Sequence, residues 1–453
     1  MIDKIKAAFV CFGEVNTPRE IINKKCNDAV KELEKIDFDI VSNDIVSDDP
    51  EGRQAQKAIE NISKKNYNLI IFCIAGWIPS HAVITVADMF SHKPMILWGL
   101  AGYYENGVLK TTADQAGTSA LRKVFEDMKY TFKYIYESPG KPPKLEEIKK
   151  FAMAAKTAAL MRQSKIGMMG YKDMNLYGTL YDGVSLRSKI GVEIEHFEML
   201  EIKQLLEKLE TREIMEVMDS IKKAWKFEGK VSDNTLRTGV EFYLALKQKI
   251  ISRKYEAVSL IDVDGMKKLL GFPPAMIFML LADNLGVCTI PENDVPGSVT
   301  QLITKYLTGQ IGAYMEFYEF MEDRVLAGVP DFVPGEVVDG PIKVLPTKFG
   351  DLNEGLLNVS KVKTGNVTLC RLVSTGDRYS MHIVTGRAVQ PGKWEEIGWT
   401  PPAPQLPSLE IFLGRPVEEF AQNVMSQHYI ISYGNNLDLY RDYCQIAGIN
   451  IIS

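Results

Sequence analysis

Four acidic side chains lie in two short stretches of the 453-residue sequence. Asp262 and Asp264 follow the apolar run in SLIDVDG, and Glu292 and Asp294 follow the apolar run in CTIPENDVPG. If both runs are strands of one parallel sheet, these acids meet at its carboxyl edge, where open α/β sheets bind ligands. Carboxylates gathered there suit a hard cation such as Mg²⁺ or Mn²⁺. A structural role stays open, because Asp and Asn also form turns and cap helices, and SVTQLITKYL follows directly.

Two of the five histidines are candidates for ligand contact. His81 stands close after Trp77 in GWIPSHAV, at a predicted junction between a strand and a helix. His428, in MSQHYIISYGN, precedes an apolar run, and taken alone it favours a core or capping role. The other three histidines stand in turn or strand patterns typical of structural residues.

A nucleotide site is not indicated. The segments after the first strand of each predicted α/β series read CFGEVNTPRE and GMMGYKD. Neither contains the glycine spacing of a dinucleotide fold or of a phosphate-binding loop.

The elements that position these residues form two α/β series. Residues 1–164 alternate apolar, β-branched runs with helical patterns, and uniformly apolar strands joined by helices predict a parallel sheet. A second series, over 165–332, carries the acids, with a long charged helical region over 201–254. Residues 333–453 are richer in proline, glycine and short alternating runs, which predict a small antiparallel barrel or sandwich and closing helices. The predicted fold is therefore α/β, with two Rossmann-like parallel-sheet domains followed by a small C-terminal antiparallel β-barrel-like domain.

Composition narrows the class of protein. The net charge is -5 and the basic residues are scattered, so nucleic acid is not an expected partner. The longest apolar run, AMIFMLLA, is far shorter than the roughly 20 residues that span a bilayer, so no membrane is expected. The N-terminus enters a strand without room for a signal peptide, and six scattered cysteines favour free thiols in a reducing compartment over disulfides or zinc. We therefore expect a cytoplasmic protein.

Two segments around the candidate residues resemble the L-fucose/L-arabinose isomerase family. PENDVPGSVTQLITKYLTG (291–309) is similar to an acidic strand end of that family, and FAQNVMSQHYIISYGNNLDLYRDYCQIAGI (420–449) is similar to its closing segment. The stretch 170–202 gives weaker support. The similarity in order and character covers most of residues 165–450, whereas the first domain agrees only as a generic α/β unit.

The resemblance implies a metal site. In that family one Mn²⁺-type ion is held by a glutamate, an aspartate and a histidine; Asp294 matches the aspartate and His428 the histidine. The glutamate is absent, and Asp264 or Asp262 stands in its place. Mn²⁺ suits such oxygen and nitrogen ligands best, with Mg²⁺ or Co²⁺ as alternatives.

The resemblance also implies a reaction, in which an aldose becomes a ketose through an enediol. A metal ion would stabilise the developing negative charge on oxygen, and a carboxylate would move the proton between C1 and C2. Asp264 is then the expected base, with Asp262 or Glu292 in reserve, beside the ligand Asp294.

Further contacts follow from the family's assembly. Gln427 takes the place of a residue that contacts substrate, and Glu292 is a further expected substrate contact that orients the site. Family members are homo-oligomers in which a neighbour's first domain closes the pocket, so Trp77 and His81 are expected to contact sugar in a trimer or hexamer.

Two functions are therefore compatible with the sequence. The first is a metal-dependent isomerase of a pentose or 6-deoxyhexose. The second is a carbohydrate-binding or regulatory protein on the same scaffold, with weak or lost isomerase activity. Metal analysis and an assay with aldose sugars distinguish them.

Overall fold

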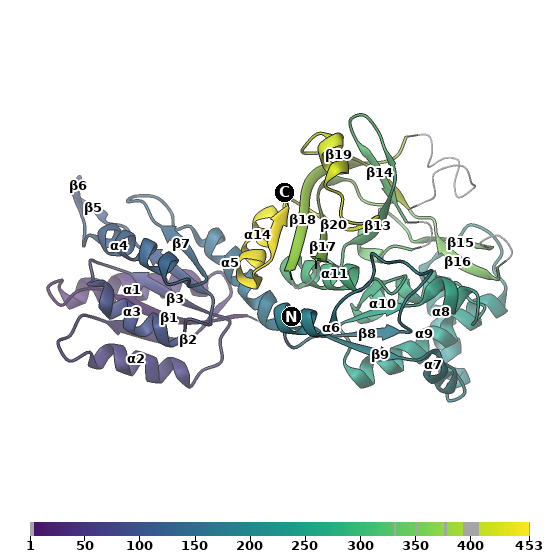
Figure 1. The fold of residues 1–453 in the computed structure, drawn as a ribbon, viewed down its shortest axis with the longest axis horizontal. Coiled ribbons are helices and arrows are strands. Elements are labelled where there is room, and N and C mark those ends of the chain that lie inside the picture. The colour runs from purple at the N-terminus through teal and green to yellow at the C-terminus, as the bar shows by residue number, and fades with distance from the viewer. Residues whose placement is uncertain (1–3, 330–331, 349–351, 376–377, 393–406, 453) are drawn as a thin grey trace. The chain divides into compact units, whose positions relative to one another are not determined.

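The computed structural model contains two compact units, residues 1–159 and 160–453 (Figure 1). The structure describes residues 4–329, 332–348, 352–375, 378–392 and 407–452. The predicted middle and C-terminal domains fall within the second unit, and their boundary at residue 332 stays a prediction.

The first unit is built on a parallel sheet with the strand order β2-β1-β3-β4-β7. Its strands are β1 (Ile5–Phe12), β2 (Phe38–Val46), β3 (Leu69–Ile74), β4 (Met95–Gly99) and β7 (Phe132–Tyr136). Its helices are α1 (Arg19–Glu34), α2 (Arg53–Ser63), α3 (Ser80–Met89) and α4 (Asp114–Asp127), and a small hairpin joins β5 (Tyr103–Glu105) to β6 (Val108–Lys110). Helix α5 (Leu145–Met161) begins in this unit and ends in the second. The buried apolar runs thus form the predicted parallel sheet. Strand β7 was not predicted, because its sequence FKYIY mixes polar and aromatic residues at the sheet edge.

The second unit begins with another parallel sheet, in the order β12-β11-β8-β9. Its strands are β8 (Lys165–Met169), β9 (Glu193–Phe197), β11 (Ala257–Leu260) and β12 (Cys288–Ile290). The helices here are α6 (Gly183–Lys189), α7 (Met199–Leu206), α8 (Thr211–Ala224), α9 (Asp233–Arg253), α10 (Ala275–Leu285) and α11 (Val295–Thr308), and a π-helical turn, η1, spans Asp262–Lys267. Because β8, β11 and β12 run parallel, the acids that follow them share one edge.

The C-terminal part is a closed six-stranded antiparallel barrel, as predicted (Figure 1). Its order is β17-β20-β13-β14-β19-β18, and pairing of β17 with β18 closes it. The strands are β13 (Ala313–Phe320), β14 (Val325–Gly328), β17 (Gly365–Thr375), β18 (Arg378–Val389), β19 (Ser408–Leu413) and β20 (His428–Tyr433). The first two barrel strands lie before residue 332.

Smaller elements complete the second unit. These are the sheet of β10 (Lys226–Phe227), β15 (Lys343–Lys348) and β16 (Glu354–Asn358), the short helix η2 (Gly335–Val337), strand β21 (Asn450–Ile452), α13 (Val417–Gln422) and α14 (Leu437–Ala447). One apolar core runs from the parallel sheet through α9 and α10 into the barrel. Burial of this shared core fixes the sheet edge against the barrel.

The prediction of six free thiols is wrong for one pair. Cys11 on β1 and Cys26 on α1 form a disulfide, with their Cα atoms 6.0 Å apart. Sequence spacing gave no sign of it, because strand and helix contact brings the two residues together. The other four cysteines are buried free thiols. No helix in the described ranges is long and apolar enough to cross a bilayer.

Thiol counting tests this disulfide. Denatured protein that has not been reduced should show four reactive thiols, and six after reduction. Under oxidising conditions Cys26→Ser should lower stability by about 3 kcal/mol, the value for a loop of 15 residues. The same substitution should have a much smaller effect in reductant, and six thiols before reduction would contradict the pairing.

Candidate active site

The candidate site lies where the carboxyl ends of β8, β11 and β12 meet the barrel. Strand β12 ends in a turn whose residues Glu292 and Asn293 have positive φ angles of 62° and 51°. Two consecutive non-glycine residues in the left-handed region are uncommon, and such strain is found mostly at functional sites. The turn sends neighbouring acids in different directions, so that Glu292 and Asp294 have separate environments.

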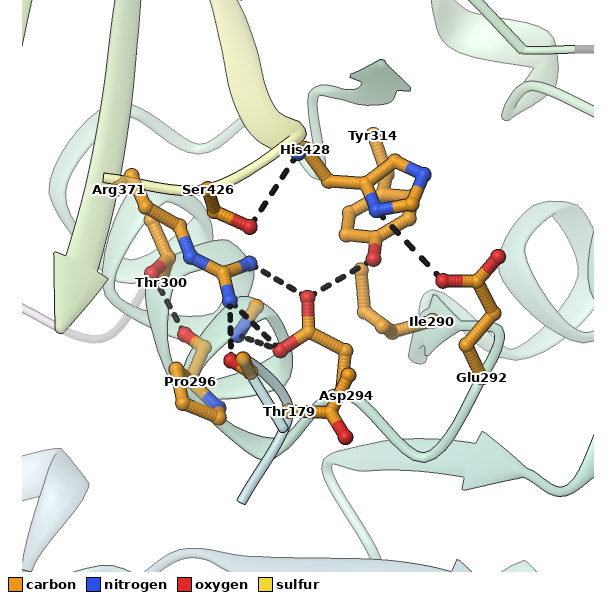
Figure 2. A network of polar contacts seen from close by, with 12 residues as sticks. Thr179, Ile290, Glu292, Asp294, Pro296, Thr300, Tyr314, Arg371, Ser426 and His428 are labelled. Atoms are coloured by element: carbon orange, nitrogen blue, oxygen red, sulfur yellow. Dashed lines mark hydrogen bonds and ion pairs between the residues drawn. The ribbon is translucent and has the colours of Figure 1, made fainter. Parts of the chain in front are cut away.

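Asp294 is buried and forms a two-pronged ion pair with Arg371 of β17 (Figure 2). Its Oδ1 accepts from the Gly297 N–H at 3.0 Å and from Arg371 Nη2 at 2.9 Å. Its Oδ2 accepts from Arg371 Nη1 and from the Tyr314 hydroxyl, the latter at 2.8 Å. Asp294 thereby caps α11, which confirms the structural role considered for it.

The charge of Asp294 is stabilised by these donors. Burial alone would raise the pKa of this carboxyl, but the Arg371 guanidinium and the Gly297 N–H outweigh burial and hold the pKa below its ordinary value. Both carboxylate oxygens already accept two hydrogen bonds, which uses their ordinary acceptor capacity.

His428 lies between two glutamates at the start of β20. Its Nδ1 is 3.6 Å from Glu292 Oε2, and its Nε2 is 3.6 Å from Glu316 Oε2 of β13. The ring stacks on Tyr314 with 4.3 Å between ring centroids. Burial lowers the pKa of His428 to about 3, although the charge of Asp294 opposes this. His428 is therefore neutral at ordinary pH. The glutamates keep some contact with solvent, with side chains 16% and 29% exposed.

Asp262 faces the same turn from the end of β11. It is 2% exposed, and its Oδ1 accepts from the Glu292 N–H at 2.7 Å. Its Oδ2 is 3.2 Å from the Lys267 ammonium. Asp173, in the loop after β8, is fully buried, and burial together with the nearby Asp262 carboxylate raises the pKa of Asp173 to about 6.

The Asp264 side chain points away from the turn that Asp262 contacts and has other hydrogen-bond partners. Its oxygens accept from the Met174 N–H at 2.8 Å and from the Lys268 ammonium at 2.7 Å. The Lys268 hydrogen bond and the Met174 N–H hold the pKa of Asp264 below its ordinary value.

The side chains do not fit the ligand set that the resemblance implies. Asp294 has its acceptor positions filled, and Asp264 is engaged by other donors. Within the described part of the chain, no three His, Cys, Asp or Glu side chains form a group that could hold a metal ion. Glu292 and Glu316 instead flank His428, each 3.6 Å from one of its ring nitrogens.

The remaining predicted residues lie at the periphery or in the first unit. Gln427 is exposed beside His428. Trp77 is 40% exposed and His81 lies in the first turn of α3, both in residues 1–159. Their predicted contact with sugar stays a prediction.

Sequence reasoning missed Asp173, Tyr314, Glu316 and Arg371. A signal existed for two of them: Arg371 interrupts the apolar run TLCRLV, and Glu316 interrupts AYMEF. A charged residue within a buried strand requires a partner.

Replacement of Arg371 tests the central ion pair. Arg371→Met leaves the Asp294 carboxylate buried without its cation, and we expect the second unit to lose about 3–5 kcal/mol of unfolding free energy in urea. Arg212→Ala, which breaks the exposed pair with Glu216, should leave the urea midpoint unchanged. Equal effects of the two substitutions would contradict the structural role of the buried pair.

Comparison with known proteins gives distant similarity. No protein-family model matches the sequence. The chain is 19% identical over 263 residues to the sulfoquinovose isomerases of Priestia aryabhattai and Priestia megaterium, which covers 58% of this chain and 58% of each relative. It is 21% identical over 307 residues to the L-arabinose isomerase of Shouchella clausii, which covers 64% of this chain and 60% of that protein. The chain thus spans less than two thirds of the length of these relatives, and its similarity is to proteins named as sugar isomerases.

Proposed function

We propose that this protein is an aldose-ketose isomerase of the fucose/arabinose type, acting on a pentose or a 6-deoxyhexose. One observation carries the proposal: a buried histidine, His428, stands between two glutamates at the carboxyl edge of a parallel sheet. The distant similarity to sulfoquinovose and L-arabinose isomerases supports the same class of reaction.

Glu292 is the proposed base. It is the less exposed of the two glutamates, so bulk water competes less with a substrate for its carboxylate. Glu292 takes the proton from C2 of the open-chain aldose while the carbonyl oxygen at C1 gains a proton, which gives the enediol. The proton on O2 then leaves, C1 receives a proton from Glu292, and the product is the ketose.

His428 supplies the polar contact for this transfer. A neutral imidazole keeps one N–H donor, and burial makes its hydrogen bond to the developing oxyanion stronger than it would be in water. Because the ring stacks on Tyr314, whose hydroxyl is bonded to Asp294, the imidazole is held in place. Glu316, 3.6 Å from the other ring nitrogen, is the proposed carrier of the hydroxyl protons: it donates a proton to O1 as the enediol forms and regains a proton from O2 as the ketose forms.

A second function has an observation in its favour. The predicted ligand Asp294 is bound to Arg371, which disfavours turnover that depends on the metal-ligand set, and the alternative is a carbohydrate-binding or regulatory protein with weak or lost isomerase activity. The proposal of a homo-oligomer, a trimer or hexamer with Trp77 and His81 near the sugar, rests on the family resemblance. The proposal of a cytoplasmic location rests on the N-terminal sequence, the short apolar runs and the scattered cysteines, and the disulfide between Cys11 and Cys26 counts against the cysteine argument.

Solvent exchange distinguishes turnover from binding. The protein is incubated in D₂O with L-arabinose, L-fucose or sulfoquinovose, and NMR follows ketose formation and deuterium at C1 and C2. We expect Glu292→Gln to lower kcat by about 10²–10⁴-fold with little change in KM, because the amide cannot accept the proton. Glu319→Gln, at an exposed position on the same strand as Glu316, is the control and should keep wild-type kcat. Sugar binding by calorimetry without deuterium incorporation in any of the three sugars would overturn the isomerase proposal.

Metal dependence is a separate prediction, which rests on the resemblance. The hydrogen bonds of Asp264 and Asp294 argue against it. The resemblance predicts Mn²⁺, or Mg²⁺ or Co²⁺, on Asp264, Asp294 and His428. From the bonding of Asp264 and Asp294 we expect the rate after EDTA treatment to equal the rate with added Mn²⁺, and the metal content measured by mass spectrometry to be the same in wild type and His428→Gln. One ion per chain that is lost in His428→Gln would restore the metal-based set.

A further inference from the structure

We infer that Asp262 is a positioning residue, which holds the Glu292 carboxylate in place through the Glu292 backbone N–H. The inference rests on the proposed function, in which Glu292 is the base. It assigns Asp262 a role distinct from the catalytic one that the sequence suggested.

The first step is the conformation of the turn. Glu292 and Asn293 both have left-handed backbone angles, which side-chain-bearing residues adopt only where surrounding contacts hold them. Three hydrogen bonds provide those contacts. The Glu292 N–H donates to Asp262 Oδ1 at 2.7 Å, the Asn293 N–H donates to Leu260 O at 3.2 Å, and Asn293 Nδ2 donates to Met169 O at 3.2 Å. Of these bonds, only the one from Asp262 acts on Glu292 itself.

The second step is that Asp262 is itself held. The η1 turn that carries it is fixed by Asp173, whose carboxylate accepts the N–H groups of Val263 and Asp264, each at 2.8 Å. The Lys267 ammonium lies 3.2 Å from the second oxygen of Asp262, with its side chain only 9% exposed. The carboxylate is therefore a fixed acceptor rather than a mobile group.

The third step is that Asp262 has no access to a substrate. It is 2% exposed, and its side chain contacts the Glu292 N–H, the Lys267 ammonium and the Asp173 carboxyl group. The effect of Asp262 on the reaction is therefore indirect, and its direct link to the proposed base is the bond to the Glu292 N–H. A displacement of a catalytic group by about 1 Å costs on the order of 100-fold in rate, so one backbone hydrogen bond is enough to matter.

The test is a double-mutant cycle on the isomerase reaction. We expect Asp262→Ala to lower kcat by about 10- to 100-fold with KM within about twofold, because the turn loses its acceptor. Asp262→Asn keeps an oxygen for the Glu292 N–H but turns its NH2 group toward the Lys267 ammonium, so it should recover part of the rate that Asp262→Ala loses. In a Glu292→Gln background, Asp262→Ala should have little further effect, since the two residues act as one unit.

Two further measurements make the result decisive. Asp283→Ala is the matched control. Asp283 lies at the C-terminal end of α10, and its carboxylate also accepts a backbone N–H, that of Gly335, at 2.7 Å. Its replacement should leave kcat at the wild-type value. Crystal structures of both Asp262 variants provide a readout that needs no activity. The left-handed turn at 292–293 should be lost with Ala and kept with Asn.

The outcomes separate the inference from the function. An unchanged turn in Asp262→Ala, or an equal loss of kcat in both backgrounds, overturns the positioning role. Absence of turnover in the wild type overturns the proposed function instead, and the crystal structures then decide on Asp262 alone.

Discussion

The ion pair between Asp294 and Arg371 is the interaction on which the rest of the site depends. It joins the end of β12 and the start of α11 to barrel strand β17, across 77 positions of sequence. Both side chains are 1% exposed, so each charge has given up its water and relies on the other for compensation. The sheet edge and the barrel wall are thereby fixed relative to one another, and residues contributed by each can act together.

The turn before this pair points three consecutive side chains toward three different parts of the structure. Asp294 faces the barrel arginine, Asn293 ties the turn to the end of β8, and Glu292 faces His428. In an extended strand, alternate residues would point the same way, and Glu292 and Asp294 would share one environment. The left-handed backbone prevents this. It places a structural carboxylate and a reactive one two positions apart, and the unfavourable backbone conformation is held by bonds to neighbouring strand ends.

The sequence predicted the architecture better than the chemistry, for a physical reason. Buried parallel strands are continuous apolar runs, and the segments 5–12 and 165–170 could be recognised without knowledge of their partners. The barrel strands β17 and β18 were also visible from their alternation. Site geometry depends on pairs brought together by packing, such as His428 with Glu316. The strand pattern was enough to place Asp262 and Asp294 at one edge of the sheet. Their partners Arg371 and Tyr314 were not foreseen, because those contacts arise only when the barrel packs on that edge.

The partners change what the acids can do. A carboxylate becomes a metal ligand or a base only with a lone pair to offer, and Asp294 offers its lone pairs to Arg371, Tyr314 and Gly297. Glu292 lies at the edge of this network, close to a histidine that burial keeps neutral. A neutral imidazole is a weaker acid than an imidazolium, and its pKa is closer to that of an enediol oxygen. It can therefore donate a hydrogen bond to the developing oxyanion without losing its proton outright, while the proton transfer at carbon is left to the glutamate.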